Sequence, residues 1–264
     1  MKTQTSKLAW IAGVCASTMA VSAAGSIAIP VTIRDFAASP QTKPGGVLYH
    51  PDFQVKPAKT FRTPGLVNVN LGGDNTPVYS GIVNDQITSG FSFSSWFHDN
   101  ALYNVQVPVA PLVFNEIGNT GIYAYVNPSF FPINGLGFGN YQGGKNYHFT
   151  LEMHQMFTYE AGQQFAFLGD DDIWVFINKK LVIDIGGIHP ARPGVVDLDT
   201  LGLTPGGNYQ FDLFYAERHT SESNFKAETS IVFKTLPEAN AFAPVAALAG
   251  IGGLMVMRRR RQTA

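Results

Sequence analysis

Apolar and polar residues alternate along several stretches of this chain. In residues 147–154, aromatic and aliphatic side chains occupy the odd positions, and histidine, threonine and glutamate occupy the even ones. Residues 209–215 repeat this period of two, and residues 228–234 also fit an extended strand. Because successive side chains of a strand point to opposite faces, the first two stretches predict β-strands with one buried face each.

A further pair of strands is predicted close together in the sequence. Ile173–Asn178 and Leu181–Ile185 are apolar runs separated by Asn178, Lys179 and Lys180, which is typical of a β-hairpin. Residues 25–75 are rich in Pro-Gly and Gly-Gly turns, and no helix of ordinary length is indicated. The chain therefore predicts an all-β fold, an antiparallel β-sandwich formed by one domain at residues 25–235.

The first 24 residues are typical of a secretory signal peptide. Lys2 and Lys7 precede the short apolar run Leu8–Met19, and small residues at 21–23 offer a cleavage site. Cys15 is the only cysteine. Removal of residues 1–24 would leave a domain without disulfides, so its stability is expected to come from the core or from bound metal.

The last residues predict a transmembrane segment. Phe242–Met257 is uncharged, spans roughly 24 Å as a helix, and is followed by four arginines at 258–261. Leu236-Pro237-Glu238 stands just before this run. Residues 236–264 resemble the PEP-CTERM sorting signal of Gram-negative bacteria, although Ala239 replaces the usual second proline. That resemblance implies recognition by an exosortase and passage through the inner membrane.

Charge and motifs narrow the function classes. Without Lys2, Lys7 and the terminal arginines, the remaining domain is acidic, which disfavours nucleic acid or an anionic membrane as its partner. The sequence contains no Gly-x-Ser-x-Gly elbow, no Walker loop and no catalytic cysteine. These observations favour a binding or structural protein over an enzyme.

Three consecutive aspartates, Asp170, Asp171 and Asp172, separate two predicted strands at 165–169 and 173–177. Neighbouring carboxylates raise one another's pKa unless a cation or N–H donors compensate their charge. Clustered oxygen ligands of this kind are what calcium prefers. Taken alone, however, the triplet is more typical of a solvated acidic turn. Both interpretations stay open at this point.

The residues around the triplet resemble the fibro-slime domain. The resembling stretches are Ile33–Phe36, His50–Phe53, Phe130–Pro132, Phe165–Phe176, Lys180–Asp184, Gly186–His189, Leu198–Gly202, Asp212–His219, Asn224–Phe225 and Glu228–Ile231. Together they span most of residues 33–233. The fibro-slime domain is similar to protective-antigen-type β-sandwiches, which occur in adhesins, glycosidase accessory modules and toxins. The resemblance implies a lectin-like sandwich.

In carbohydrate-binding members of that superfamily, an adjacent aspartate pair, often joined by a cis peptide, holds a calcium ion that contacts sugar hydroxyls. An asparagine from a later loop supplies another ligand. Carried over to this chain, the resemblance implies that Asp170, Asp171 and Asn224 bind both the calcium ion and the carbohydrate. Asp172 is the alternative member of the pair.

Four other conspicuous side chains have structural explanations. His148 and His154 lie on one face of a predicted strand but about 20 Å apart, which is too far for both to hold one metal ion. Trp96 and Trp174 could stack on sugars, but the pattern around them favours the core. We expect all four to support the fold.

Two charged pairs are expected to be structural as well. Asp197 and Asp199 precede Gly202 and are interpreted as caps of a turn. Glu217 and Arg218 are interpreted as an ion pair or a brace for a loop.

We therefore expect an exported, non-enzymatic protein of the cell surface or biofilm matrix of a Gram-negative bacterium, anchored at its C-terminus. Its adhesin-like domain would bind a polysaccharide or glycan through calcium. The alternative is a structural matrix protein that self-associates without a sugar ligand, and an enzyme acting on polysaccharide is the third interpretation. Glycan arrays run with calcium and with chelator would separate the three.

Overall fold

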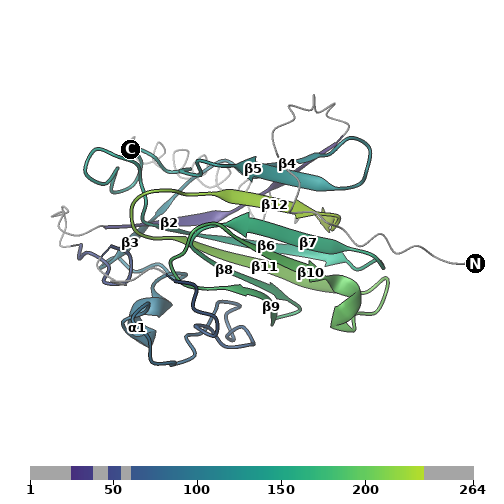
Figure 1. Ribbon diagram of the computed structural model, residues 1–264, viewed down its shortest axis with the longest axis horizontal. Helices are drawn as coiled ribbons and strands as arrows, with labels where there is room; N and C mark the ends of the chain where they lie inside the picture. Colours follow the sequence, from purple (N-terminus) through teal and green to yellow (C-terminus); the bar gives the residue numbers. More distant parts are fainter. Residues whose placement is uncertain (1–24, 38–46, 55–60, 235–264) are drawn as a thin grey trace, which may run out of the picture. The chain divides into compact units, whose positions relative to one another are not determined.

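The computed structural model describes residues 25–37, 47–54 and 61–234. Within them, two antiparallel sheets lie face to face (Figure 1). The six-stranded sheet has the order β1 (Ser26–Ile29), β4 (Leu112–Glu116), β5 (Tyr123–Asn127), β12 (Phe225–Thr229), β7 (Gln164–Gly169) and β10 (Arg192–Asp197). The seven-stranded sheet has the order β3 (Asn104–Val107), β2 (Thr32–Phe36), β6 (Phe149–Thr158), β11 (Asn208–Glu217), β8 (Asp172–Ile177) and β9 (Lys180–Ile185), with β13 (Phe233–Lys234) pairing with β6. The prediction of an all-β antiparallel fold is confirmed.

Helical structure in the described ranges consists of two short turns. The helix α1 (Gly90–Ser94) follows Ser89, whose side chain accepts a hydrogen bond from a backbone N–H of the first turn. The 3-10 helix η2 (Leu198–Leu201) follows Asp197, whose carboxylate accepts from the N–H of Asp199. The predicted capping role of Asp197 is therefore confirmed.

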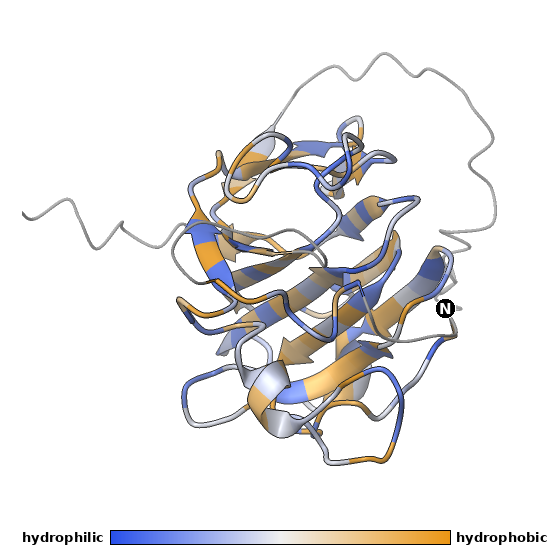
Figure 2. Cartoon of the chain, turned by 90° about the vertical axis from the view of Figure 1, so that its left-hand side faces the viewer, coloured by the Kyte–Doolittle hydropathy of each residue, from blue (hydrophilic) through white to orange (hydrophobic). Residues whose placement is uncertain are grey.

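The main core lies between the two sheets. β6 and β11, ten residues each, pair along their whole length near the centre of the seven-stranded sheet. Their alternation places Phe149, Leu151 and Leu213 in this core, where they pack with Phe167 and Phe225 of the opposite sheet. Figure 2 shows the same alternation as orange and blue stripes along the strands. Burying each of these side chains stabilises the fold by about 1.5–3 kcal/mol.

The outer face of the seven-stranded sheet is also covered, although the alternation predicted only one buried face. A lobe formed by residues 47–54 and 61–103 packs against this face. Its buried apolar residues are Phe53, Leu66, Val67, Leu71, Ile87, Phe93, Trp96 and Phe97, and those of the sheet are Phe36, Trp174, Phe176, Phe214 and Ala216. Trp96 and Trp174 are both 0% exposed. Their predicted role in the core is confirmed, and neither ring is open to a sugar.

The local predictions for strands are confirmed in one case and wrong in another. β8 and β9 form the predicted hairpin, and its turn residues Asn178 and Lys179 have φ values of 51° and 66°. The stretch 228–234, predicted as one strand, is divided between β12 and β13, which belong to different sheets. The chain crosses between the sheets after Thr229, and alternation does not reveal such a crossing because apolar residues on both sides of it face the same core.

The predicted signal peptide at 1–24 and the predicted sorting tail at 236–264, including the segment 242–257, lie outside the described residues. No helix in the described part of the chain is long and apolar enough to cross a membrane.

Candidate functional site

Asp170 and Asp171 connect the two sheets. β7 ends at Gly169 in the six-stranded sheet, and β8 begins at Asp172 in the seven-stranded sheet. The peptide bond between Asp170 and Asp171 is cis. The three aspartates are only 4%, 5% and 0% exposed. The interpretation of the triplet as a solvated acidic turn is therefore wrong.

Asn224 lies beside Asp170 because β12 pairs with β7. The first residue of β12, Phe225, stands opposite Gly169, so the residues flanking this pair come together. The backbone N–H of Asn224 donates to Oδ1 of Asp170, and its Nδ2 donates to Oδ2 at 2.7 Å. The structure thus brings together two of the residues that the sequence singled out.

Asp171 accepts hydrogen bonds from two backbone groups. The N–H of His189 lies 3.2 Å from Oδ1, and the N–H of Arg218 lies 3.0 Å from Oδ2. Burial raises the pKa of Asp171 well above its usual range, and the charge of Asp172 raises it further, while Arg218 acts in the opposite direction. Arg218 therefore compensates the ionised form of Asp171 only in part.

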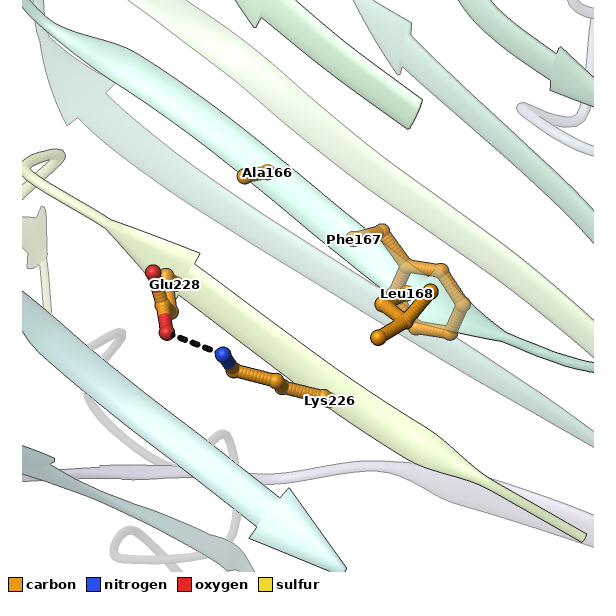
Figure 3. Close-up of a pocket in the computed structure, with 5 residues that line it drawn as sticks. All are labelled: Ala166, Phe167, Leu168, Lys226 and Glu228. Carbon is orange, nitrogen blue, oxygen red and sulfur yellow. Dashed lines mark ion pairs between the residues drawn. The ribbon is translucent and has the colours of Figure 1, made fainter. Parts of the chain in front are cut away.

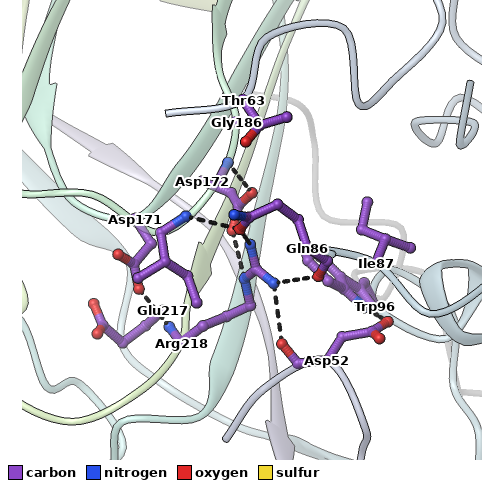
Figure 4. Close-up of polar contacts among 12 residues, drawn as sticks. Asp52, Thr63, Gln86, Ile87, Trp96, Asp171, Asp172, Gly186, Glu217 and Arg218 are labelled. Atoms are coloured by element: carbon purple, nitrogen blue, oxygen red, sulfur yellow. Dashed lines mark hydrogen bonds and ion pairs between the residues drawn. The ribbon is translucent and has the colours of Figure 1, made fainter. Parts of the chain in front are cut away.

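Asp172 contacts the side chain of Arg218, whereas Asp171 contacts its backbone N–H (Figure 4). Oδ2 of Asp172 accepts from Nε of Arg218 at 2.6 Å, and its Oδ1 accepts from the N–H of Gly187 at 2.6 Å. Both side chains of this ion pair are fully buried. Because Arg218 already neutralises its charge, Asp172 is a weaker candidate for a calcium ligand than Asp170 or Asp171. Arg218 pairs with Asp172 rather than with Glu217, whose Oε2 accepts from the hydroxyl of Tyr215 at 2.7 Å.

The two remaining carboxylates line a groove of about 420 Å³. Its other lining residues are Ile188, His189, Pro190, Arg218, His219, Thr220, Ser221 and Glu222. Of these, Pro190 and residues 220–222 are exposed. The volume falls within the range of roughly 300–1,000 Å³ that is typical of small-molecule sites.

The ligand atoms at this groove suit calcium. Among the described residues, each of the four carboxylate oxygens of Asp170 and Asp171 accepts one hydrogen bond. A carboxylate oxygen has two lone pairs, so one remains on each oxygen for a cation. Nδ2 of Asn224 donates to Asp170, so the amide would have to turn over and give up this hydrogen bond before its Oδ1 could serve as a ligand. In this part of the chain no three His, Cys, Asp or Glu side chains are grouped for metal binding. A calcium ion, which takes about 6–8 oxygens, would complete its shell with water or ligand hydroxyls.

A second cavity is lined by Ala166, Phe167 and Leu168 of β7 and by an ion pair on β12 (Figure 3). Nζ of Lys226 lies 2.7 Å from Oε1 of Glu228. The cavity measures about 10 Å³, enough for roughly one water molecule. It is too small for a sugar.

The histidines noted in the sequence are dispersed. Nε2 of His148 lies 2.6 Å from Oε1 of Gln54, and Nδ1 of His154 lies 2.7 Å from Oδ1 of Asp212. His189 does belong to the groove, but it contributes its backbone N–H to Asp171. The sequence indicated neither this donor nor that of Arg218, since every residue except proline carries a backbone N–H.

Residues 138–236 match the family model of the PA14 domain. The matched range includes the aspartate triplet, Arg218 and Asn224. The expectation of a lectin-like β-sandwich agrees with this match. The fibro-slime and PEP-CTERM names are not confirmed.

Three proteins of Dictyostelium discoideum are similar to the chain over more residues than this match covers. Protein psiQ is 45% identical over 193 residues, which cover 68% of this chain and 20% of psiQ. Protein psiJ is 43% identical over 229 residues, covering 76% of this chain and 30% of psiJ. Protein psiC is 41% identical over 197 residues, covering 69% of this chain and 38% of psiC. The chain thus spans about a fifth to two fifths of these curated relatives.

Two solved PA14 domains are also similar. The PA14 sugar-binding domain from an RTX adhesin is 15% identical with a TM-score of 0.27, covering 34% of this chain and 51% of that domain. The PA14 domain of the antifreeze protein MpAFP is 13% identical with a TM-score of 0.28, covering 44% of this chain and 62% of that one.

The expected localisation requires correction. Relatives from Dictyostelium, a eukaryote, contradict a protein anchored at the surface of a Gram-negative bacterium. The inner membrane and an exosortase lose their support as partners together with that expectation.

Proposed function

We propose that the PA14 domain is a non-enzymatic, adhesin-like module that binds carbohydrate through a calcium ion held by Asp170, Asp171 and Asn224. One observation carries the proposal. Two buried, adjacent carboxylates line a groove of about 420 Å³, and each of their four oxygens accepts one hydrogen bond, which leaves one lone pair for a cation. The PA14 match agrees with it, since this is a carbohydrate-binding, adhesin-type domain.

The chemistry of the site favours holding a ligand over cleaving it. Glycoside hydrolysis uses two carboxyl groups on opposite sides of a sugar bond, roughly 5–10 Å apart. Asp170 and Asp171 are consecutive residues, and N–H donors fix their oxygens in place. A calcium ion at this position would neutralise them and present open coordination positions to vicinal hydroxyls.

The test is a glycan array, with calcium titrations of the full chain by calorimetry. Asp170→Asn is the informative variant, because an asparagine at position 170 can still accept from the N–H of Asn224 and donate to its turned amide, while one negative charge is lost. Asp99→Asn is the matched control, since Asp99 is 70% exposed and pairs with Arg34 away from the groove. Glycan binding should disappear with chelator and in Asp170→Asn but persist in Asp99→Asn.

Two outcomes would contradict the proposal. Glycan binding that is insensitive to chelator would remove the calcium ion from the mechanism. Self-association without glycan binding would favour the structural alternative. In the expected case, calcium at a hundred times its dissociation constant also stabilises the fold by about 2.7 kcal/mol, which a melting curve detects.

A further inference from the structure

Arg218 is a buried cation at the base of the groove. It follows directly after β11, and its side chain is 0% exposed. A buried guanidinium is costly unless its donors are all paired. Nε of Arg218 donates to Asp172, and the remaining nitrogens donate away from the sandwich, toward the lobe of residues 47–54 and 61–103 (Figure 4).

Three residues of this lobe hold the guanidinium. Nη1 donates to the backbone oxygens of Asp52 at 3.0 Å and Gln86 at 2.8 Å, and Nη2 donates to Oε1 of Gln86 at 3.3 Å. The guanidinium carbon lies 4.7 Å from the centroid of the Trp96 ring, which adds a cation–π contact. The orientation of Arg218 is therefore set by the lobe.

Gln86 connects both hydrogen-bond donors of Asp171. Its Oε1 accepts from Nη2 of Arg218 and from the N–H of Ile188 at 3.2 Å. The backbone N–H of Arg218 and the N–H of His189, the residue after Ile188, are the two groups that donate to the Asp171 carboxylate. One buried amide of the lobe thus fixes the two segments that position this carboxylate.

Arg218 also separates the roles of the three aspartates. Its guanidinium forms a buried ion pair with Asp172, and its backbone N–H donates to Asp171. A cation bound at this site would therefore be coordinated by the carboxylates of Asp170 and Asp171, while the carboxylate of Asp172 stays paired with Arg218. Without Arg218, the negative charges of three adjacent buried carboxylates would repel one another with no positive side chain paired to any of them.

The supporting residues lie outside the range that identifies the PA14 domain. The match covers residues 138–236, whereas Asp52, Gln86 and Trp96 precede it. We propose that Arg218 and Gln86 are positioning residues of the Asp170–Asp171 site, and that the lobe sets its calcium affinity through them. This inference rests on the proposed calcium site but concerns residues that do not touch the ion.

Gln86→Met is the test variant, because it retains the side-chain length and removes the acceptor for Arg218 and Ile188. Gln155→Met is the matched control. Gln155 is also a buried glutamine, 4% exposed, but it lies away from the aspartates. It pairs with Phe211 of β11, whereas Asp172 pairs with Ala216, five residues further along the same strand. Arg218→Lys and its control Arg34→Lys form a second pair of variants. Arg34 is a buried arginine of β2 and forms an ion pair with Glu152. The strand β6 separates β2 from β11, so Arg34 is distant from the groove.

Two measurements are made on the full-length chain. Calorimetry gives the calcium dissociation constant, which should rise about ten-fold or more in Gln86→Met and Arg218→Lys, and by less than two-fold in the controls. Hydrogen exchange of the Arg218 and His189 amides is measured without calcium, and it should accelerate in the two test variants only.

The outcomes distinguish this inference from the proposed function. If the wild type binds no calcium while amide exchange still responds to Gln86→Met, the proposed function fails and the positioning of Asp171 stands. If the amides exchange as in the controls, or if calcium binds the test variants and controls equally well, the positioning role is overturned. The second pair of variants gives the same decision if Gln86→Met does not fold.

Discussion

Asn224 holds both carboxylate oxygens of Asp170, one with its backbone N–H and one with its side-chain amide. The two residues are 54 positions apart in the sequence. They meet because Gly169 and Phe225 are paired in the six-stranded sheet, directly before and after them. The geometry of the candidate calcium site is therefore a consequence of strand register.

The side chain of Asn224 should be needed for calcium binding and only modestly for stability. Asn224→Ala removes the 2.7 Å bond to Asp170 and the amide oxygen, but it keeps the backbone donor. We expect calcium-dependent glycan binding to be lost, with a stability loss of about 0.5–1.5 kcal/mol in chelator, because one side-chain hydrogen bond is removed while the backbone donor stays. Urea unfolding and calcium calorimetry measure the two effects. Asn208→Ala, at an exposed asparagine, is the control, and retention of full calcium affinity by Asn224→Ala would contradict the ligand assignment.

Gly169 should tolerate no side chain. A Cβ at this position would overlap the carbonyl oxygen of Asn224 and lie 2.6 Å from Cε1 of Phe167. Gly169→Ala is therefore expected to separate β12 from β7, to cost about 1–3 kcal/mol or more, and to abolish calcium binding. Gly73→Ala is the matched control, since a Cβ there meets nothing within 4 Å. Thermal unfolding of the pair should show a large shift for the first and almost none for the second.

The sequence predicted those parts of the fold that depend on local patterns. Alternation located β6 and β11, and the residues 178–180 located the hairpin. The sequence did not predict the lobe, because Leu66, Leu71 and Ile87 follow no regular period. They form a core only together with Trp174 and its neighbours on the outer face of the seven-stranded sheet. Periodicity describes one element at a time, and this second core is formed between distant segments.

The candidate site shows the same limit. The resemblance, rather than any pattern, singled out Asn224, and the role of Asp172 depends on Arg218, which is 46 residues away. The contribution of Gln86 comes from 132 residues before Arg218. A carboxylate triplet looks uniform in sequence, and only long-range partners divide it into two candidate calcium ligands and one member of an ion pair.

The hairpin turn offers a stabilising substitution. Lys179 has a φ of 66°, a left-handed conformation that disfavours every residue with a Cβ. Lys179→Gly should relieve about 1 kcal/mol of this cost, partly offset by the greater freedom of glycine in the unfolded chain. Its backbone oxygen still accepts from the N–H of Leu71. A melting temperature raised by a few degrees is expected, whereas Lys180→Gly in β9 should lower it.

His154 lies between two carboxylates on the outer face of the seven-stranded sheet. Its Nδ1 is 2.7 Å from Oδ1 of Asp212, and its Nε2 is 3.5 Å from Oε2 of Glu152. Burial alone would lower the pKa of His154, but hydrogen bonds to the two carboxylates and their charges raise it from 6.5 to about 9. Arg34, bound to Glu152, is the other charged group in this network.

The sign of the resulting pH dependence follows from linkage. Because the folded pKa of His154 exceeds its unfolded value, the stabilisation is complete below about pH 6.5 and is lost as the pH rises through about 9. Melting temperatures of the wild type should therefore fall between these pH values more steeply than those of His154→Gln. His148→Gln is the control, since burial lowers the pKa of His148 to about 3, outside this window. An NMR titration of His154 with a midpoint near 6.5 would contradict the prediction, because it would show that Asp212 and Glu152 do not keep the ring charged. A steeper fall of the wild-type melting temperature at alkaline pH would then have to come from another group.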